Sequence, residues 1–192
     1  AKHSLIISGH TLDKFTQNVE VKNALVTLFA RGVDVTLILL NPHSSHHELS
    51  HILKSSGTAH DQIMKSIHFF RRIFEAYNPH KFDVLLTNYM PRFRTIMVDD
   101  ELCCINLYRY GKDVETTPEF RLAKTTDGIG SSWFQTILDS LYQMIKSNDV
   151  IPLIKDGRFN ENWVNCRVAH ILNNCMKEYH FSISELIFWN GM

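Results

Sequence analysis

The segment that decides the fold is YMPRFRTIMVDD, residues 89–100. Its middle, TIMV, is apolar and largely β-branched, and it predicts a short strand over Phe93–Val98. Arg92 and Arg94 stand at the start of this strand, and the two-residue period of a strand places them on one face. Two neighbouring guanidinium groups repel each other, so a phosphate or carboxylate between them would stabilise the pair. The segment therefore predicts a short strand with an anion site at its start.

The sequence on both sides of this segment alternates between apolar runs and helical patterns. Apolar or β-branched runs predict further strands at residues 4–8, 33–40, 82–87, 102–108 and 118–124. Apolar residues at helical spacing predict helices at residues 17–31, 46–55, 61–77, from 131 onward and at 162–177. A loop is expected to contain Pro152 and Gly157. The fold class is predicted to be α/β, with a mixed, mostly parallel sheet flanked by helices.

Length and composition narrow the class of protein. The 192 residues suit an α/β domain at 1–150, followed by a helical extension at 151–192 packed on the same domain. Twenty basic residues balance twenty acidic ones, so any anion site must be local. The sequence has four cysteines without a Cys-x-x-Cys pair, no membrane-spanning apolar run and no signal peptide, which predicts a cytoplasmic protein. Other domains of the same polypeptide are expected partners.

Polar residues follow the first two predicted strands. The first strand ends at Ser8, and His10 lies two residues further on; Asn41 directly follows the second strand. Ligands of open α/β sheets gather at the carboxyl ends of the strands. Ser8, His10 and Asn41 are therefore expected to line the same crevice as Arg92 and Arg94.

The spacing Arg92-x-Arg94-x4-Asp99 resembles the His-x-Lys-x4-Asp motif of the phospholipase D superfamily. The surroundings are similar as well, because a strand precedes the motif, an acidic turn follows it, and a further strand comes next. Together with the opening strand–helix–strand pattern, the likeness spans residues 4–145. It implies a phospholipase D-like sandwich.

The positions that differ from the family motif imply a loss of chemistry. The family's nucleophilic histidine corresponds to Arg92, and arginine stays protonated and cannot attack phosphorus. The phosphate-holding lysine corresponds to Arg94, which suits binding, and the aspartate that supports the histidine corresponds to Asp99. The family commonly shows Gly-Ser and a nearby Asn after the motif, whereas residues 106–109 read Asn-Leu-Tyr-Arg, so this part of the pattern is degenerate as well. The resemblance thus implies no catalytic residue, and a ligand-binding set of Arg92, Arg94, Asp99, Ser8, His10, Asn41 and Arg109.

By this resemblance the chain is a non-catalytic module of a larger bacterial regulatory or defence protein. It would sense a phosphate-bearing or nucleotide-type anion, contact a nucleic-acid backbone, or mediate dimerisation. The family builds its site from two motif copies, so a single copy implies a homodimer with the arginine pairs facing each other across a two-fold axis. No cofactor, metal or membrane is expected.

Other interpretations of the same residues stay open. Arg92 and Arg94 are also typical of solvated charges at a sheet edge. The segment HSSHHELSH (43–51) has helical i,i+4 spacing that suits Zn²⁺, and His10 lies where a general base would act, which together favour a phosphodiesterase or nuclease. A purely structural interaction domain would instead expose an apolar patch around Ile187, Phe188 and Trp189.

Overall fold

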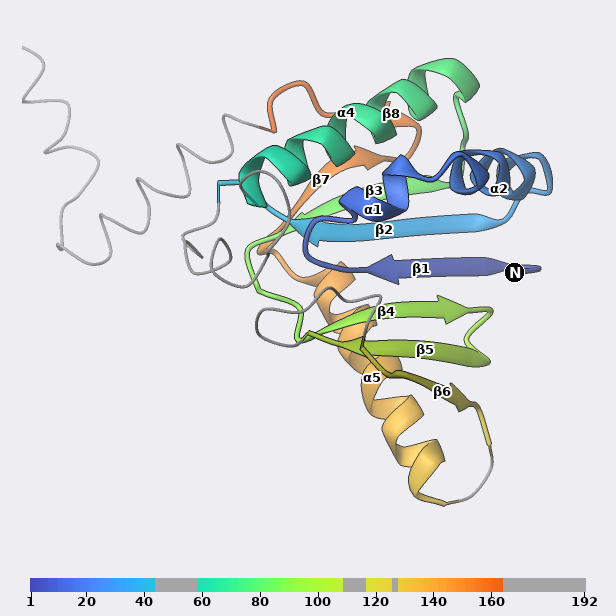
Figure 1. Cartoon of the computed structure of the whole chain (residues 1–192). Helices are drawn as coiled ribbons and strands as arrows, with labels where there is room; N and C mark the ends of the chain where they lie inside the picture. Colours follow the sequence, from blue (N-terminus) through green and yellow to red (C-terminus); the bar gives the residue numbers. More distant parts are fainter. Residues whose placement is uncertain (44–58, 109–116, 126–127, 164–192) are drawn as a thin grey trace, which may run out of the picture. The chain divides into compact units, whose positions relative to one another are not determined.

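The computed structural model of the chain describes residues 1–43, 59–108, 117–125 and 128–163 (Figure 1). Contacts group Ala1–Asn160 into one compact unit and Glu161–Met192 into a second. The sheet and its helices belong to the first unit. The helix predicted at 46–55 and nearly all of the helix predicted at 162–177 lie outside the described residues.

The described strands form one sheet in the order β6-β5-β4-β1-β2-β3-β7-β8. Only β1 with β2 and β2 with β3 pair in parallel, and the other five pairings are antiparallel. The mixed α/β sheet is confirmed, but the prediction that it is mostly parallel is wrong. Short turns join β4 to β5 and β7 to β8 as antiparallel neighbours, and β4 and β7 run opposite to β1 and β3 beside them. The strands are β1 (Ser4–Ser8), β2 (Asp34–Leu40), β3 (Phe82–Thr87), β4 (Phe93–Val98), β5 (Leu102–Leu107), β6 (Glu119–Ala123), β7 (Val150–Lys155) and β8 (Arg158–Phe159).

A tight hairpin turn joins β4 to β5. Asp99 and Asp100 have φ angles of 55° and 53°, and the Glu101 amide donates to the Val98 carbonyl at 3.0 Å. A two-residue turn of this kind needs positive φ at both central positions, which aspartate tolerates better than most residues. The acidic turn that the sequence predicts is therefore confirmed.

The prediction of one loop that contains both Pro152 and Gly157 is wrong for Pro152, whereas Gly157 does lie in a turn. Pro152 lies inside β7, opposite Leu85 of β3, where the register shifts between Val84 and Leu85. A ladder irregularity of this kind tolerates a proline, which cannot donate a backbone hydrogen bond. Asp156 and Gly157, with φ angles of 50° and 67°, form the turn from β7 into β8. The two breakers thus belong to a hairpin at the border of the sheet.

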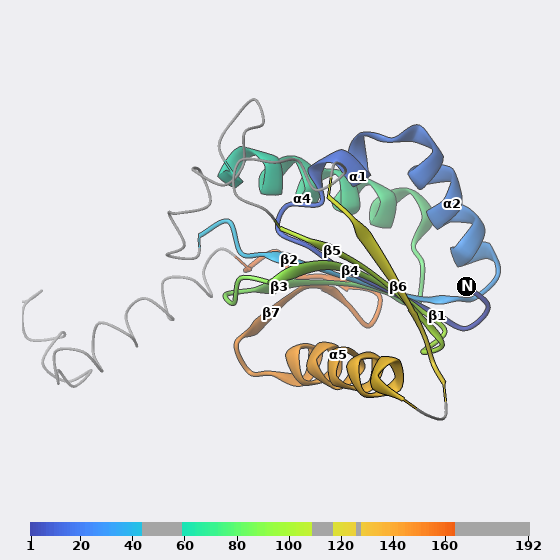
Figure 2. The same ribbon diagram turned by 60° about the horizontal axis from the view of Figure 1, so that its bottom comes forward.

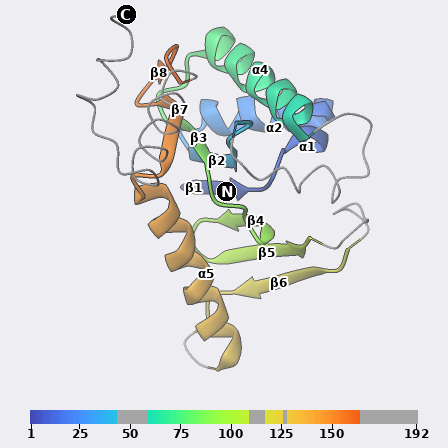
Figure 3. The same ribbon diagram turned by 90° about the vertical axis from the view of Figure 1, so that its left-hand side faces the viewer.

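Helices cover both faces of the sheet (Figures 2 and 3). One face carries α1 (Asp13–Gln17), α2 (Val19–Ala30) and α4 (Ala59–Tyr77), and the other carries α5 (Ile129–Lys146). The helix predicted at 17–31 corresponds to α2. It begins only after Asn18, which has an extended backbone and caps α2 by accepting from the Glu20 amide at 2.9 Å. Within the described residues, no helix is long and apolar enough to cross a membrane.

The face under α5 holds a compact apolar core. Phe134, Leu138 and Leu141 of α5 pack on side chains from the central strands, namely Ile6, Ile38, Leu85, Met97, Cys103 and Ile105. On the opposite face, α4 buries Ile63, Ile67, Phe70 and Ile73 at helical spacing. Burying side chains of this size contributes about 1.5–3 kcal/mol each, so these two layers fix the positions of the strand ends.

Candidate functional site

The strands β1, β2 and β3 run in parallel, so their carboxyl ends lie side by side along one side of the sheet, called here the carboxyl edge. The side where these strands begin is called the amino edge. Strand β4 runs the opposite way and therefore begins at the carboxyl edge. Ser8 pairs with Thr95, so Arg94 lies one residue beyond the last β1–β4 pair, toward the carboxyl edge. His10 and Asn41 follow β1 and β2 at the same edge. The edge thus gathers residues that are far apart in the sequence.

Arg94 is held by a side chain of the neighbouring strand. It is half-buried, and its Nε and Nη2 donate to Oδ1 of Asn106 on β5 at 3.3 and 3.1 Å. Asn106 is itself buried, with 4% of its surface exposed. This contact orients the guanidinium. Asn106 was not singled out from the sequence, although the short β4–β5 turn that the sequence predicts already places position 106 opposite Arg94.

Arg92 is exposed and lies in a bend just before β4, which begins at Phe93. The strand alternation that was expected to align Arg92 with Arg94 therefore does not reach Arg92. For Arg94 the alternation holds: Met97 belongs to the core under α5, so Arg94 shares the opposite face with Ile96 and Val98.

Ser8 lies on the other face from Arg94. It pairs with Thr95 on one side and with Ile38 on the other, and Ile38 belongs to the core under α5. Directly opposite residues in a sheet point to the same face, so the Ser8 side chain, which is 2% exposed, points toward α5. The structure therefore does not bring Ser8 and Arg94 together in one crevice.

Asp99 lies at the amino edge of the sheet, where β1 begins. Its carboxylate accepts hydrogen bonds from the backbone amides of Lys2, His3 and Ser4 at 2.7–2.9 Å. These bonds, that from His3 first, hold the pKa of Asp99 well below its usual range. Asp99 lies just beyond the far end of β4, roughly 20 Å along the strand from Phe93. It therefore anchors the start of β1 and is not brought to the arginines.

His10 is buried at the carboxyl edge, with 3% of its surface exposed. Its Nε2 lies 2.7 Å from the Pro91 carbonyl oxygen, and its ring stacks on Tyr108 at 3.6 Å between centroids and 13° between planes. A carbonyl only accepts, so Nε2 carries the proton, and Nδ1 is left without a hydrogen-bond partner among the described residues. Burial lowers the pKa of His10 to about 4, against which the Pro91 contact acts.

Backbone contacts make His10 a junction between four strands. The Tyr108 hydroxyl, just beyond β5, accepts from the His10 amide at 2.9 Å, and the His10 carbonyl accepts from the Leu40 amide of β2 at 2.9 Å. With the ring contact to Pro91, the residue ties the end of β1 to β2, β5 and the approach to β4. Gly9 permits this packing, because a Cβ there would lie 2.8 Å from Cδ2 of Leu12 and 3.1 Å from the Tyr108 hydroxyl.

Asn41 joins the ends of β2 and β3. Its Nδ2 donates to Asn88 Oδ1 at 2.9 Å, and its Oδ1 accepts from the His43 amide at 3.0 Å. Asn88 in turn donates to the Asp149 carbonyl at 3.4 Å, and the Tyr89 hydroxyl donates to Oδ2 of Asp149 at 2.9 Å. These contacts give Asn41 a structural role at the same edge as Arg94.

The remaining predicted residues lie outside the described part of the chain. Arg109 is not described, nor are His46, His47 and His51 of the histidine-rich segment. Among the residues that the structure describes, no group of three His, Cys, Asp or Glu side chains is placed to hold a metal ion. The apolar patch expected around Ile187, Phe188 and Trp189 also falls outside the description.

Known proteins share this fold at low sequence identity. No protein-family model matches the sequence, and no significant match is found among curated proteins. The structure is similar to phosphatidylserine synthase from Haemophilus influenzae Rd KW20, with a TM-score of 0.52 and 12% identity over 93% of this chain and 40% of that chain.

Two further solved structures are similar, at TM-scores below 0.5. Nuc, a phospholipase D family member from Salmonella typhimurium, gives a TM-score of 0.45 and 13% identity over 79% of this chain and 82% of that chain. TrmBL2, an archaeal chromatin protein with a novel mode of DNA binding, gives a TM-score of 0.43 and 9% identity over 74% of this chain and 44% of that chain. The α/β fold, a mixed sheet flanked by helices, is thus similar to that of phosphatidylserine synthase. Likeness at such identities concerns the fold and not the chemistry.

Proposed function

We propose that this chain is a non-catalytic, phospholipase D-like module that binds a phosphate-bearing anion at Arg92 and Arg94. The observation that carries the proposal is the Asn106 amide, which orients the half-buried Arg94 guanidinium at the carboxyl edge of the sheet. A guanidinium held in one orientation suits the planar geometry of phosphate recognition. Arg92, exposed just before β4, supplies a second positive charge close to the same edge.

The proposed anion is a nucleotide-type small molecule, with a nucleic-acid backbone as the second source of the same phosphate chemistry. The module is proposed to act as a homodimer within a larger cytoplasmic protein of bacterial regulation or defence. The likeness of its fold to phosphatidylserine synthase, of which it spans 40%, supports a phospholipase D-like module attached to or paired with further structure.

The residues at this edge favour binding over catalysis. Arg92 occupies the place of the nucleophilic histidine in the motif it resembles, and its guanidinium stays protonated. His10, the other candidate base, is 3% exposed, its Nε2 is engaged by Pro91, and its pKa is lowered to about 4. Burial keeps the imidazole away from a water or a substrate, so the phosphodiesterase alternative receives less support than the binding role.

The test is thermal unfolding of the chain with ATP, a cyclic dinucleotide, a short oligonucleotide and sulfate. A ligand at 100 times its Kd adds about 2.7 kcal/mol to the free energy of unfolding, which is a readily measured rise in Tm. The matched control for R92A/R94A is R31A/R158A, which removes two exposed arginines at the opposite edge. The proposal expects stabilisation that R92A/R94A abolishes and the control retains. Equal stabilisation of both double variants would refute it.

A further inference from the structure

The two borders of the sheet differ in how they end. At one border, β8 is only two residues long. At the other, β6 presents five residues, and no strand of the described sheet pairs with its outer side (Figure 1). Short edge strands protect a sheet from pairing with another chain, whereas a longer open edge is a template for such pairing. The border at β6 is therefore the place where a further strand can be added.

The hydrogen-bond pattern shows which residues face this open edge. The Lys124 amide donates to the Glu101 carbonyl at 2.7 Å, in the same register as the β5–β6 pairs. Residues that bond to the neighbouring strand alternate along an antiparallel ladder, so Phe120 and Leu122 also direct their backbone groups to β5. Glu119, Arg121 and Ala123 direct theirs outward, where they are able to pair with another strand.

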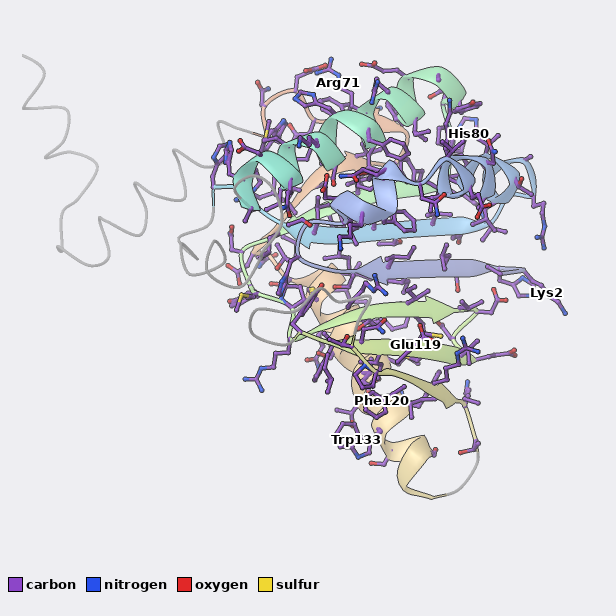
Figure 4. All side chains as sticks on the ribbon, viewed as in Figure 1. Lys2, Arg71, His80, Glu119, Phe120 and Trp133 are labelled. Carbon is purple, nitrogen blue, oxygen red and sulfur yellow. The ribbon has the colours of Figure 1, made fainter. Side chains whose placement is uncertain are left out.

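The side chains of β6 separate charge from apolar surface. Glu119 and Arg121 share one face, where Arg121 Nε donates to Glu119 Oε1 at 2.7 Å. Phe120 lies on the other face, opposite Ile105 and on the side of α5. It is 49% exposed, and Trp133 of α5 is 59% exposed. Figure 4 shows both aromatic side chains at this border, and α5 contacts β6.

We propose that β6 pairs antiparallel with β6 of a second copy of this chain, about a two-fold axis that passes between the two Phe120 residues. In this register Glu119 lies opposite Arg121 of the second copy, and Arg121 lies opposite its Glu119. Both pairs belong to the residues whose backbone groups face the open edge, so the hydrogen bonding and the charges agree. On the other face the two Phe120 rings meet beside Trp133, which covers exposed aromatic surface.

The neighbouring registers are worse for a reason of charge alone. A shift by one step along the ladder in one direction places Arg121 opposite Arg121 of the second copy, and a shift in the other places Glu119 opposite Glu119. Like charges directly opposite each other destabilise a strand pair. The sequence Glu-Phe-Arg in β6 thus selects one symmetric register.

The outer side of β6 supplies an interface for the homodimer that is part of the proposed function, and to that extent the inference rests on the proposed function. The interface does not depend on the anion site. A two-fold axis perpendicular to the sheet keeps each face on its own side. Arg94 of the two copies would therefore lie on one face of a joined sheet, rather than facing each other as the family resemblance implies.

Sedimentation of the full chain over a range of concentrations tests the proposal. The wild type is expected to dimerise, and E119R or R121E is expected to raise the dimer Kd by about tenfold or more. An equimolar mixture of the two variants restores the complementary pairs only between chains, so it is expected to form a heterodimer. Each variant strand still carries two like charges in the mixture. A heterodimer would therefore show that the variants act on the interface and not on the folding of β6 itself. K124E is the matched control, because Lys124 lies beyond the paired residues, and it is expected to dimerise like the wild type.

A monomeric wild type would overturn the proposal. So would a dimer that persists unchanged in both E119R and R121E, because it would use another surface, and so would a mixture that remains monomeric. Retained melting temperatures of the two variants show that they fold. Anion binding is measured separately through R92A/R94A, so a failure of the β6 interface and a failure of the anion site give different results.

Discussion

The two edges of the sheet hold charges in different ways. At the amino edge of β1, the Asp99 carboxylate is surrounded by the backbone amides of Lys2, His3 and Ser4. At the carboxyl edge, the Arg94 guanidinium is oriented by the amide of Asn106. Three backbone amides fix the Asp99 carboxylate, and a side-chain amide orients the Arg94 guanidinium. Asp99 thus acts as a structural anchor, whereas Arg94 is the residue proposed to bind the anion.

The largest expected effect concerns His10, the buried junction at the carboxyl edge. Its pKa is lowered from 6.5 to about 4, so between these pH values the unfolded state binds a proton that the folded state does not. The contribution of His10 to the free energy of unfolding is thus fully present above pH 6.5. It falls by about 3 kcal/mol as the pH drops toward 4. Urea unfolding of wild type and H10Q over this range is expected to show the slope in the wild type, and a smaller slope in the variant.

The control is H80Q, the same exchange at an exposed histidine. H80Q is expected to keep the pH slope of the wild type. If H10Q keeps it too, His10 is not the buried, uncharged junction that holds Pro91, and the carboxyl edge is less rigid than the structure indicates.

The second expected effect tests the anchor at the other edge. D99N keeps the shape of the side chain but removes the charge that the three backbone amides stabilise, so Tm is expected to fall while anion binding is unchanged. The pKa of Asp99 is lowered, so its stabilisation is present above the unfolded value of 3.8 and is lost as the pH falls further. The melting temperature and the anion Kd are measured together at pH 7. A weakened Kd at unchanged Tm would reverse the roles assigned to the two edges.

The smallest expected effect on stability comes from Asn106, whose exchange is expected to act mainly on binding. N106A removes the acceptor that orients Arg94, and the loss of this bond costs about 1 kcal/mol of stability. The anion Kd is expected to rise about tenfold, because the guanidinium must then be ordered on binding. Titration calorimetry with the anion that stabilises the wild type measures this change. N160A, at the β7–β8 border, is the matched exchange and is expected to leave the Kd unchanged.

Local patterns predicted most of the secondary structure. Alternation and apolar runs located β1 to β6, and helical spacing located α4 and α5, because these periods depend only on neighbouring residues. Pro152 and Gly157 led to the prediction of a loop in place of β7 and β8. A proline at a ladder irregularity and a glycine in a tight turn are both compatible with these two strands. A breaker alone does not distinguish a loop from a hairpin.

The site was predicted less well than the fold. The sequence placed Arg94, His10 and Asn41 at the ends of strands, which is where they lie. It also placed Ser8 in the same crevice, but the β1–β4 register turns that side chain to the face of α5. A shift of one residue along a strand changes the face, and register is set between strands rather than within one.

The sequence by itself determined β1 to β6, the helices α2, α4 and α5, and the unusual pair of cations at the start of β4, because residue type and spacing act over a few positions. Only the tertiary structure decided that Asp99 binds the amides at the start of β1, that Asn106 orients Arg94, and that His10 closes on Pro91. These bonds join residues from 12 to 97 positions apart. Such contacts form only when packing brings separate strands into one register, and that is a property of the folded chain as a whole.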